Sequence, residues 1–115
     1  MLKDANQQQI KKVYIAIGYT DGRMGLNRLL GEIQFRFGTN PYEQGTLFLF
    51  CGRRCDRIRG IVWEGDGFLL VQKIISGGRF QWPRNSDELR EIDWDAFQRL
   101  LNGFSIVSSI PQTRT

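Results

Sequence analysis

The spacing of the apolar residues changes along the chain, and each change predicts a new element. Residues 12–19, KVYIAIGY, are rich in β-branched and aromatic residues and predict a first strand. Thr20-Asp21-Gly22 then supplies capping residues, after which apolar residues recur along one helical stripe. The stripe consists of Leu26, Leu29, Leu30, Ile33 and Phe37. It predicts an amphipathic helix that ends at Gly38.

From residue 45 the pattern is typical of strands. Four short segments, TLFLFCGR, RIRGIVWE, GFLLVQKIIS and GRFQWP, are separated by residues that favour turns. Connections this short favour antiparallel neighbours, because a parallel return needs a crossover of a dozen or more residues. The segments therefore predict an antiparallel β-meander.

A second helix is predicted in IDWDAFQRLLNGF. Asp93 is a good N-cap, and Ile92 before it is placed to pack against Phe97 in the first turn. The expected buried stripe consists of Phe97, Leu100, Leu101 and Phe104. Gly103 is expected to end the helix, and a short strand in the tail SIVSSIPQTRT is left open.

The predicted order is β-α-β-β-β-β-α, with about five strands and two amphipathic helices packed on one face of the sheet. This is a single α+β domain over residues 12–110. A polar leader is expected at residues 1–11 and a flexible tail at residues 111–115.

Length and charge narrow the class of protein. The 115 residues fit one domain, and no apolar run approaches the ~18 residues of a membrane span. The polar N-terminus has no secretory pattern, so we expect a cytoplasmic protein without a membrane partner. A net charge of +4, carried mostly by arginine, suggests an acidic partner such as nucleic acid.

Two cysteines and no histidine exclude several kinds of catalytic and metal site. Common zinc sites and the Ser-His and Cys-His catalytic pairs all need residues that this chain lacks. Cys51 and Cys55 are interpreted as free thiols. The chain contains no Gly-rich phosphate-binding motif, and we predict no cofactor, no metal and no catalytic residues.

The segment CGRRCDRIRG is the strongest candidate binding site. Arg53 and Arg54 lie in the predicted turn, and strand alternation places Arg57, Arg59 and Trp63 on one face of the next strand. One interpretation is a solvated hairpin whose arginines discourage sheet-edge pairing. The other is a phosphate-binding ridge with Trp63 as a stacking neighbour.

Two more arginines, Arg79 and Arg84, are near enough in the predicted sheet to extend this ridge. Asp21, Asp56, Glu64 and Asp66 raise the further possibility of a metal-dependent nuclease. However, each aspartate also has an ordinary explanation as a cap or turn residue.

Four blocks of the sequence carry a family resemblance. TDGRMGLNRLL, NPYEQGTLFLFCGRRCDRIRGIVWEGDGFLLVQKI, GGRFQWP and WDAFQRLLNG follow one another at familiar spacing over residues 19–103. Together they resemble the small TnpB accessory proteins of the insertion-sequence-sixty-six family of bacterial transposable elements. The chain departs from the family pattern at several positions, among them Cys51, which stands where an arginine is expected.

The resemblance implies an accessory, non-catalytic role in transposition, with element-end DNA and the transposase as partners. It favours the binding-ridge interpretation of Arg53, Arg54, Arg57, Arg59 and Arg79. A subunit that contacts only the transposase is the alternative, and a homo-oligomer is left open. The nuclease using Asp21, Asp56 and Asp66 is the third hypothesis.

Overall fold

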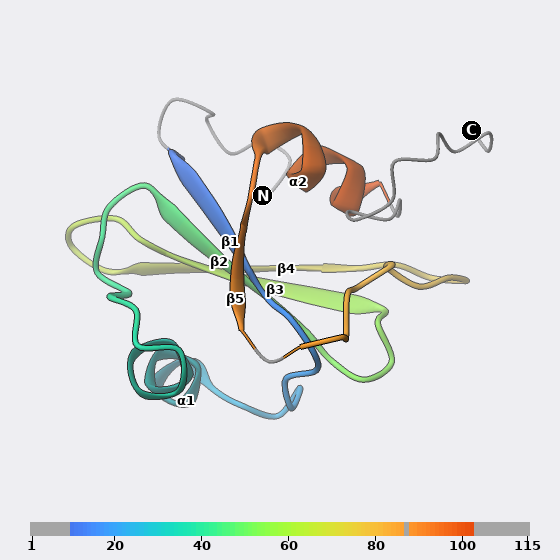
Figure 1. The fold of residues 1–115 in the computed structure, drawn as a ribbon, viewed down its shortest axis with the longest axis horizontal. Coiled ribbons are helices and arrows are strands. Elements are labelled where there is room, and N and C mark those ends of the chain that lie inside the picture. Colours follow the sequence, from blue (N-terminus) through green and yellow to red (C-terminus); the bar gives the residue numbers. More distant parts are fainter. Residues whose placement is uncertain (1–9, 87, 103–115) are drawn as a thin grey trace.

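The computed structural model describes residues 10–86 and 88–102 and shows one five-stranded sheet with helices on both sides (Figure 1). The strands are β1 (Lys12–Ala16), β2 (Thr46–Cys51), β3 (Arg57–Trp63), β4 (Phe68–Ile74) and β5 (Leu89–Ile92). Helix α1 (Leu26–Gly31) continues into a π-helical turn, η1 (Glu32–Arg36), and α2 (Trp94–Leu101) follows β5. The α+β class and the predicted order of elements are confirmed.

The sheet is mixed rather than wholly antiparallel. Its strand order is β4-β3-β2-β1-β5, and the meander β2-β3-β4 is antiparallel as predicted. β1 runs parallel to β2, because the chain between them passes through α1 and η1 and returns in the same direction. β5 pairs antiparallel with β1 at the edge opposite β4.

The predicted strand GRFQWP is wrong, and the fifth strand lies further along the chain. β4 and β5 occupy opposite edges of the sheet, so the chain that follows β4 must cross it, and residues 75–86 form this crossing segment. Phe80 and Trp82 are buried during this crossing, and Arg79 and Gln81 are exposed. The period-two pattern therefore reflects an extended segment lying on the sheet, without a neighbouring strand.

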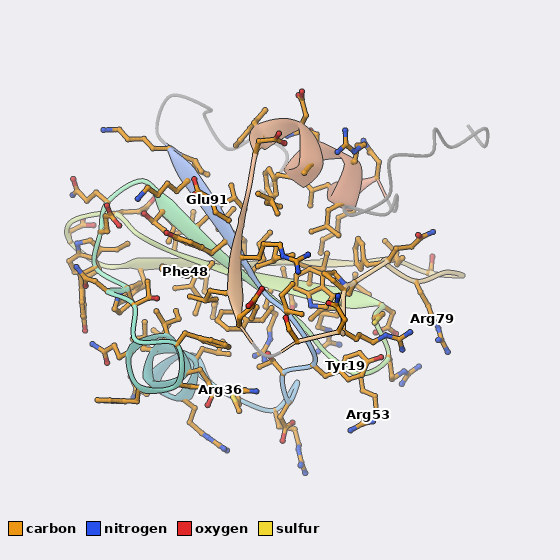
Figure 2. The ribbon with its side chains drawn as sticks, in the orientation of Figure 1. Tyr19, Arg36, Phe48, Arg53, Arg79 and Glu91 are labelled. Atoms are coloured by element: carbon orange, nitrogen blue, oxygen red, sulfur yellow. The ribbon has the colours of Figure 1, made fainter. Side chains whose placement is uncertain are left out.

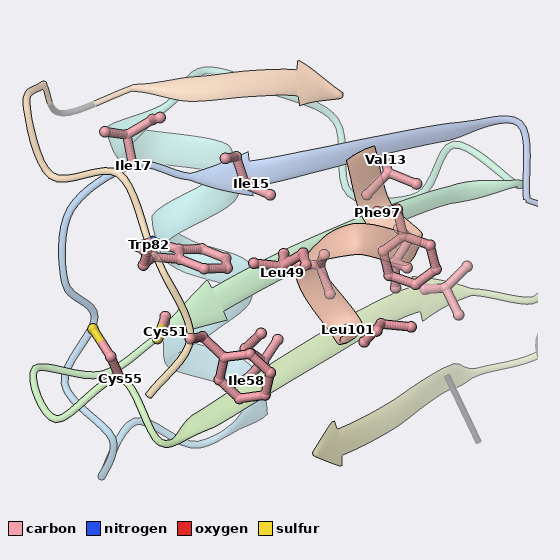
Figure 3. Packing of buried hydrophobic residues seen from close by; sticks show 14 residues of the cluster. Val13, Ile15, Ile17, Leu49, Cys51, Cys55, Ile58, Trp82, Phe97 and Leu101 are labelled. Carbon is pink, nitrogen blue, oxygen red and sulfur yellow. The ribbon is translucent and has the colours of Figure 1, made fainter. Parts of the chain in front are cut away.

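The two helices cover opposite faces, which corrects the prediction that they share one. Leu47 and Leu49 of β2 pack with Phe97 and Leu100 of α2 on the α2 face (Figure 3). Phe48 and Phe50 point the other way and pack with Leu29 and Ile33, on the α1 face. Every residue of β2 is buried, and side chains fill both faces of the sheet (Figure 2).

The predicted helix ends are confirmed in part. Asp93 caps α2, since its Oδ1 accepts a hydrogen bond from Ala96 N at 2.8 Å. Gly25 is the N-cap of α1, without a side-chain cap, so the expected capping by Thr20 and Asp21 is wrong. Gly38, with φ of 63°, follows the end of the helix as expected. Gly103, Phe104 and the tail strand left open lie outside the described residues.

Trp82 fixes the crossing segment to the sheet. Its indole Nε1–H donates to the carbonyl of Ala16 at 2.9 Å, and Gly18 N donates to the carbonyl of Pro83 at 3.0 Å. A buried hydrogen bond of this kind is costly to remove, because an unpaired polar group remains in the core. The contact holds the crossing segment to the end of β1.

We expect Trp82→Phe to lower the free energy of unfolding by about 1–3 kcal/mol, through the lost hydrogen bond and the smaller ring. Urea denaturation followed by circular dichroism measures this change. Trp63→Phe is the matched control, because Trp63 is only partly buried. An equal loss in the two variants would contradict the anchoring role of Trp82.

Candidate nucleic-acid interface

Five arginines gather at one end of the sheet, where the β2–β3 turn meets the crossing segment. Phe80 N donates to the carbonyl of Cys55 at 2.6 Å, which joins the two segments. Figure 2 shows Arg53 and Arg79 on the same side of the molecule as Tyr19. We call this surface the basic end, and its residues are Tyr19, Arg53, Arg54, Arg57, Arg79 and Arg84.

Tyr19 lies between two of these arginines. The guanidinium carbon of Arg53 is 5.4 Å from the centre of the Tyr19 ring, and that of Arg84 is 5.7 Å away. Arg84 also donates a hydrogen bond from Nη1 to the Tyr19 hydroxyl, which raises the pKa of Arg84. Exposed cation–π contacts contribute about 0.5–1 kcal/mol each, so these guanidinium groups are partly ordered.

A groove of about 370 Å³ lies beside Tyr19 and the turn. Its lining consists of Cys55 and the crossing-segment residues Arg79, Phe80, Gln81, Trp82, Pro83 and Arg84. Arg79 and Arg84 are exposed, whereas Phe80 and Trp82 are buried beneath them. An apolar floor with guanidinium groups at the rim suits a flat or apolar group attached to an anion.

The turn itself presents exposed arginines. Arg53, Arg54 and Arg57 are all exposed. Arg54 forms an ion pair with Asp56, with 3.6 Å between Nε and Oδ2. An exposed pair of this kind is weak, so Arg54 can exchange Asp56 for another anion at little cost.

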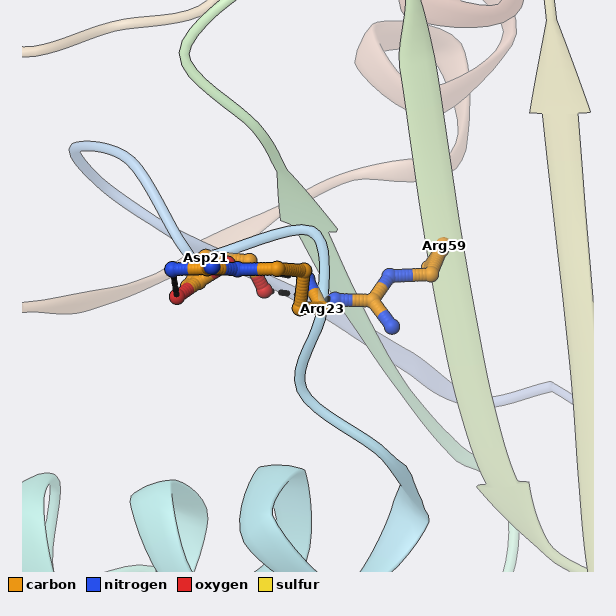
Figure 4. A network of polar contacts seen from close by, with 3 residues as sticks. All are labelled: Asp21, Arg23 and Arg59. Atoms are coloured by element: carbon orange, nitrogen blue, oxygen red, sulfur yellow. Dashed lines mark hydrogen bonds and ion pairs between the residues drawn. The ribbon is translucent and has the colours of Figure 1, made fainter.

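Arg59 differs from its neighbours because its guanidinium is used inside the protein. It donates hydrogen bonds to the backbone carbonyls of Met24 and Asp21 (Figure 4). Burial lowers the pKa of Arg59, with the charge of Arg57 as the next cause. Arg59 thus holds the loop before α1 against β3, and the ridge predicted from strand alternation does not continue through it.

Trp63 is also separated from the arginines. It lies at the opposite end of β3 from the turn, about 20 Å from Arg57 at the usual rise per strand residue. There it packs against Tyr42 and Phe68, with ring centres 5.2 and 4.8 Å apart. The aromatic neighbour of the arginines is Tyr19 instead.

The carboxylates of the nuclease hypothesis do not converge. Hydrogen bonds from Arg23 lower the pKa of Asp21 to about 2. Asp56 pairs with Arg54, and Asp66 lies in the β3–β4 turn at the far end of β3. Among residues 10–86 and 88–102 no three acidic or cysteine side chains are grouped so that they could hold a metal ion.

Cys51 and Cys55 are buried free thiols below the basic end (Figure 3). Burial raises the pKa of Cys51, and the neighbouring Cys55 and Asp56 raise it further. Cys51 therefore remains protonated at neutral and mildly alkaline pH. Its role in the described structure is to pack in the core beneath the arginine turn.

We expect Arg59→Ala to lower the free energy of unfolding by about 1–3 kcal/mol, because two charge-assisted hydrogen bonds are lost. Arg57→Ala, two residues earlier on the same face of β3, should change it by less than about 0.5 kcal/mol. Urea denaturation of both variants tests the difference. A large effect of Arg57→Ala would show that the two arginines share one structural role.

Cys51 should resist alkylation in the native protein. At mildly alkaline pH a thiol with a raised pKa is scarcely ionised, and the thiolate is the reactive form. We expect iodoacetamide to modify Cys51 slowly in buffer and rapidly in denaturing urea, as followed by peptide mass spectrometry. Equal rates in the two conditions would contradict its burial.

Comparison with known proteins identifies the family. Residues 11–110 match the family model described as IS66 Orf2 like protein. The uncharacterized protein y4jC of Sinorhizobium fredii (strain NBRC 101917 / NGR234) is 32% identical over 92 residues, which span 80% of this chain and 78% of that protein. The uncharacterized protein y4hO of the same strain is 39% identical over 72 residues, 63% of this chain and 62% of that protein.

No solved structure matches this chain. None of the helices in the described parts of the chain is long and apolar enough to cross a bilayer. The family match covers nearly the whole described structure, including the arginine turn and the crossing segment. The chain therefore belongs to the IS66 Orf2-like family of transposition-associated accessory proteins.

Proposed function

We propose that this protein is a non-catalytic DNA-binding accessory factor of insertion-sequence transposition, and that the basic end is its contact surface. The observation that carries the proposal is that Arg53 and Arg84 both lie over the Tyr19 ring, although these three residues are far apart in the sequence. Arg79 lines the same groove as Arg84. A DNA partner implies that the protein acts in the cytoplasm.

The chemistry of the surface supports a phosphate backbone as ligand. Guanidinium groups donate paired hydrogen bonds to phosphate oxygens, and such contacts provide affinity without reading sequence. Arg53, Arg54, Arg57, Arg79 and Arg84 are exposed, and Arg53 and Arg84 are also oriented by Tyr19. Arg59 is excluded from the proposed contact residues because its guanidinium is bonded to the backbone.

The groove beside Tyr19 suits a second type of contact. Its apolar floor lies below the rim arginines Arg79 and Arg84. A base or sugar lying over this floor would keep its phosphate beside the guanidinium groups. The surface would then favour an unpaired or distorted strand over a regular duplex.

The test is binding to the terminal repeat of the element and to a scrambled duplex, by fluorescence anisotropy at several salt concentrations. We expect Arg53→Ala with Arg84→Ala to reduce the slope of log K against log salt by about two units, since each phosphate contact contributes about 0.9. Arg28→Ala with Arg99→Ala removes the same charge from exposed positions on α1 and α2 and should leave the slope nearly unchanged.

The outcomes separate the alternatives. Equal slope changes in the two double variants would mean that only net charge matters, and would exclude the basic end as a defined contact. No DNA binding even at low salt would exclude DNA as the direct partner. A salt-sensitive complex with the transposase, lost in Arg53→Ala with Arg84→Ala, would then assign the same arginines to an acidic protein surface.

A further inference from the structure

β4 is an edge strand whose outer backbone groups are unpaired in the described structure. Hydrogen bonds from Ile75 N to the Asp56 carbonyl and from Glu64 N to the Gly67 carbonyl lie at the two ends of the β3–β4 pairing. They show that every second residue of β4, the odd-numbered ones, directs its backbone N–H and C=O groups toward β3. The intervening residues that direct their N–H and C=O groups away from β3 are Phe68, Leu70, Gln72 and Ile74. Within the described residues, β4 pairs with β3 alone.

The side chains of this edge are apolar and exposed. Leu70 is 50% exposed, Ile74 is 55% exposed and Leu69 is 41% exposed. Proteins usually protect such an edge with charges, proline or a bulge. The one charged residue of β4, Lys73, donates to the carbonyl of Leu101 at the end of α2. The edge therefore lacks the usual protection against strand pairing.

The opposite edge of the sheet, strand β5, is protected against strand pairing. β5 has four residues, and Arg90 and Glu91 occupy its centre. Short length and charge are common protections of an edge strand. β4 has seven residues and carries three exposed aliphatic side chains. An approaching strand is therefore expected to pair with β4 and not with β5.

We infer that a second copy of this chain pairs antiparallel with β4, so that two sheets join into one across a two-fold axis. In the register that overlaps all seven residues, Val71 lies on the axis and Leu70 lies opposite Gln72 of the second copy. Lys73 then lies opposite Leu69 of the second copy, so the two lysines do not meet. The assembly stops at two copies, because the β4 edges of both copies are then occupied.

The charges at the two ends of β4 fit this arrangement. Glu64 and Asp66 are exposed in the turn before β4, and Arg57 and Arg79 are exposed at its other end. None of these four residues forms an ion pair within the described residues. Antiparallel pairing brings the acidic turn of each copy to the basic end of the other.

The test is sedimentation equilibrium of the full chain, without DNA, over a range of concentrations. We expect a monomer–dimer equilibrium in the unmodified protein. Leu70→Lys should raise the dissociation constant at least about tenfold, because it introduces like charges near the axis. Ile74→Glu on the same edge should have the same effect, because Ile74 lies opposite Phe68 of the second copy and the new carboxylate would lie near Glu64 and Asp66 of that copy. Phe35→Lys is the matched control, because Phe35 is 86% exposed on η1, away from β4, and should leave the dimer unchanged.

A charge exchange tests the predicted orientation. Glu64→Lys with Asp66→Lys should weaken the dimer at least about tenfold, and adding Arg57→Glu with Arg79→Glu should restore it. Circular dichroism confirms that each variant is folded. A monomer at every concentration would overturn the inference, as would a dimer that Leu70→Lys and Ile74→Glu leave intact. Both readouts are independent of DNA binding, so they stand apart from the test of the proposed function.

Discussion

The segment of residues 75–86 that crosses the sheet brings Arg79 and Arg84 to the candidate surface. β4 and β5 lie at opposite edges, so the chain between them must pass over one face of the sheet. Trp82 holds this passage through the hydrogen bond from its indole to the Ala16 carbonyl, and Phe80 holds it through Cys55. Arg79 and Arg84, the arginines at the rim of the groove, therefore lie on a segment that is held by its buried side chains and by its backbone hydrogen bonds.

Different segments of the chain complete the two faces of the sheet. On the α2 face, Phe80 and Trp82 complete the core together with Phe97 of α2. On the α1 face, Arg59 reaches the loop before α1 and keeps it against β3. Arginine thus has two uses within one short segment of sequence. Arg59 stabilises the fold, whereas Arg53, Arg54 and Arg57 remain available at the surface.

The sequence predicts the parts of the fold that depend on local pattern. β2, β3, β4 and the Asp93 cap follow from apolar period and turn residues that lie close together along the chain. β5 was missed because Arg90 and Glu91 give it a polar pattern, and because its partner β1 lies at the other end of the described chain. Two strands so far apart in the sequence give no local pattern that predicts their pairing.

The candidate site shows the same limit. Alternation along β3 correctly places Arg59 on the face of Ile61, but it cannot show that backbone carbonyls of the loop before α1 meet it there. Tyr19 was missed because its contacts with Arg53 and Arg84 arise from tertiary structure alone. Sequence pattern therefore predicts which residues are exposed, while tertiary structure determines which of them meet.

The strand order also has a consequence for how the protein folds. β2, β3 and β4 are neighbours both in the sheet and along the chain, whereas β5 must find β1 across most of the described sequence. Contacts between nearby segments form faster, because less chain entropy is lost in closing a short loop. We expect the three-stranded meander to form first and the β1–β5 pairing to come later. The arginine turn then exists early, but Arg84 reaches Tyr19 only when the chain has completed its passage across the sheet. An incompletely folded chain would display the turn without Arg84 at Tyr19, so the proposed contact surface is complete only after the last strand has paired.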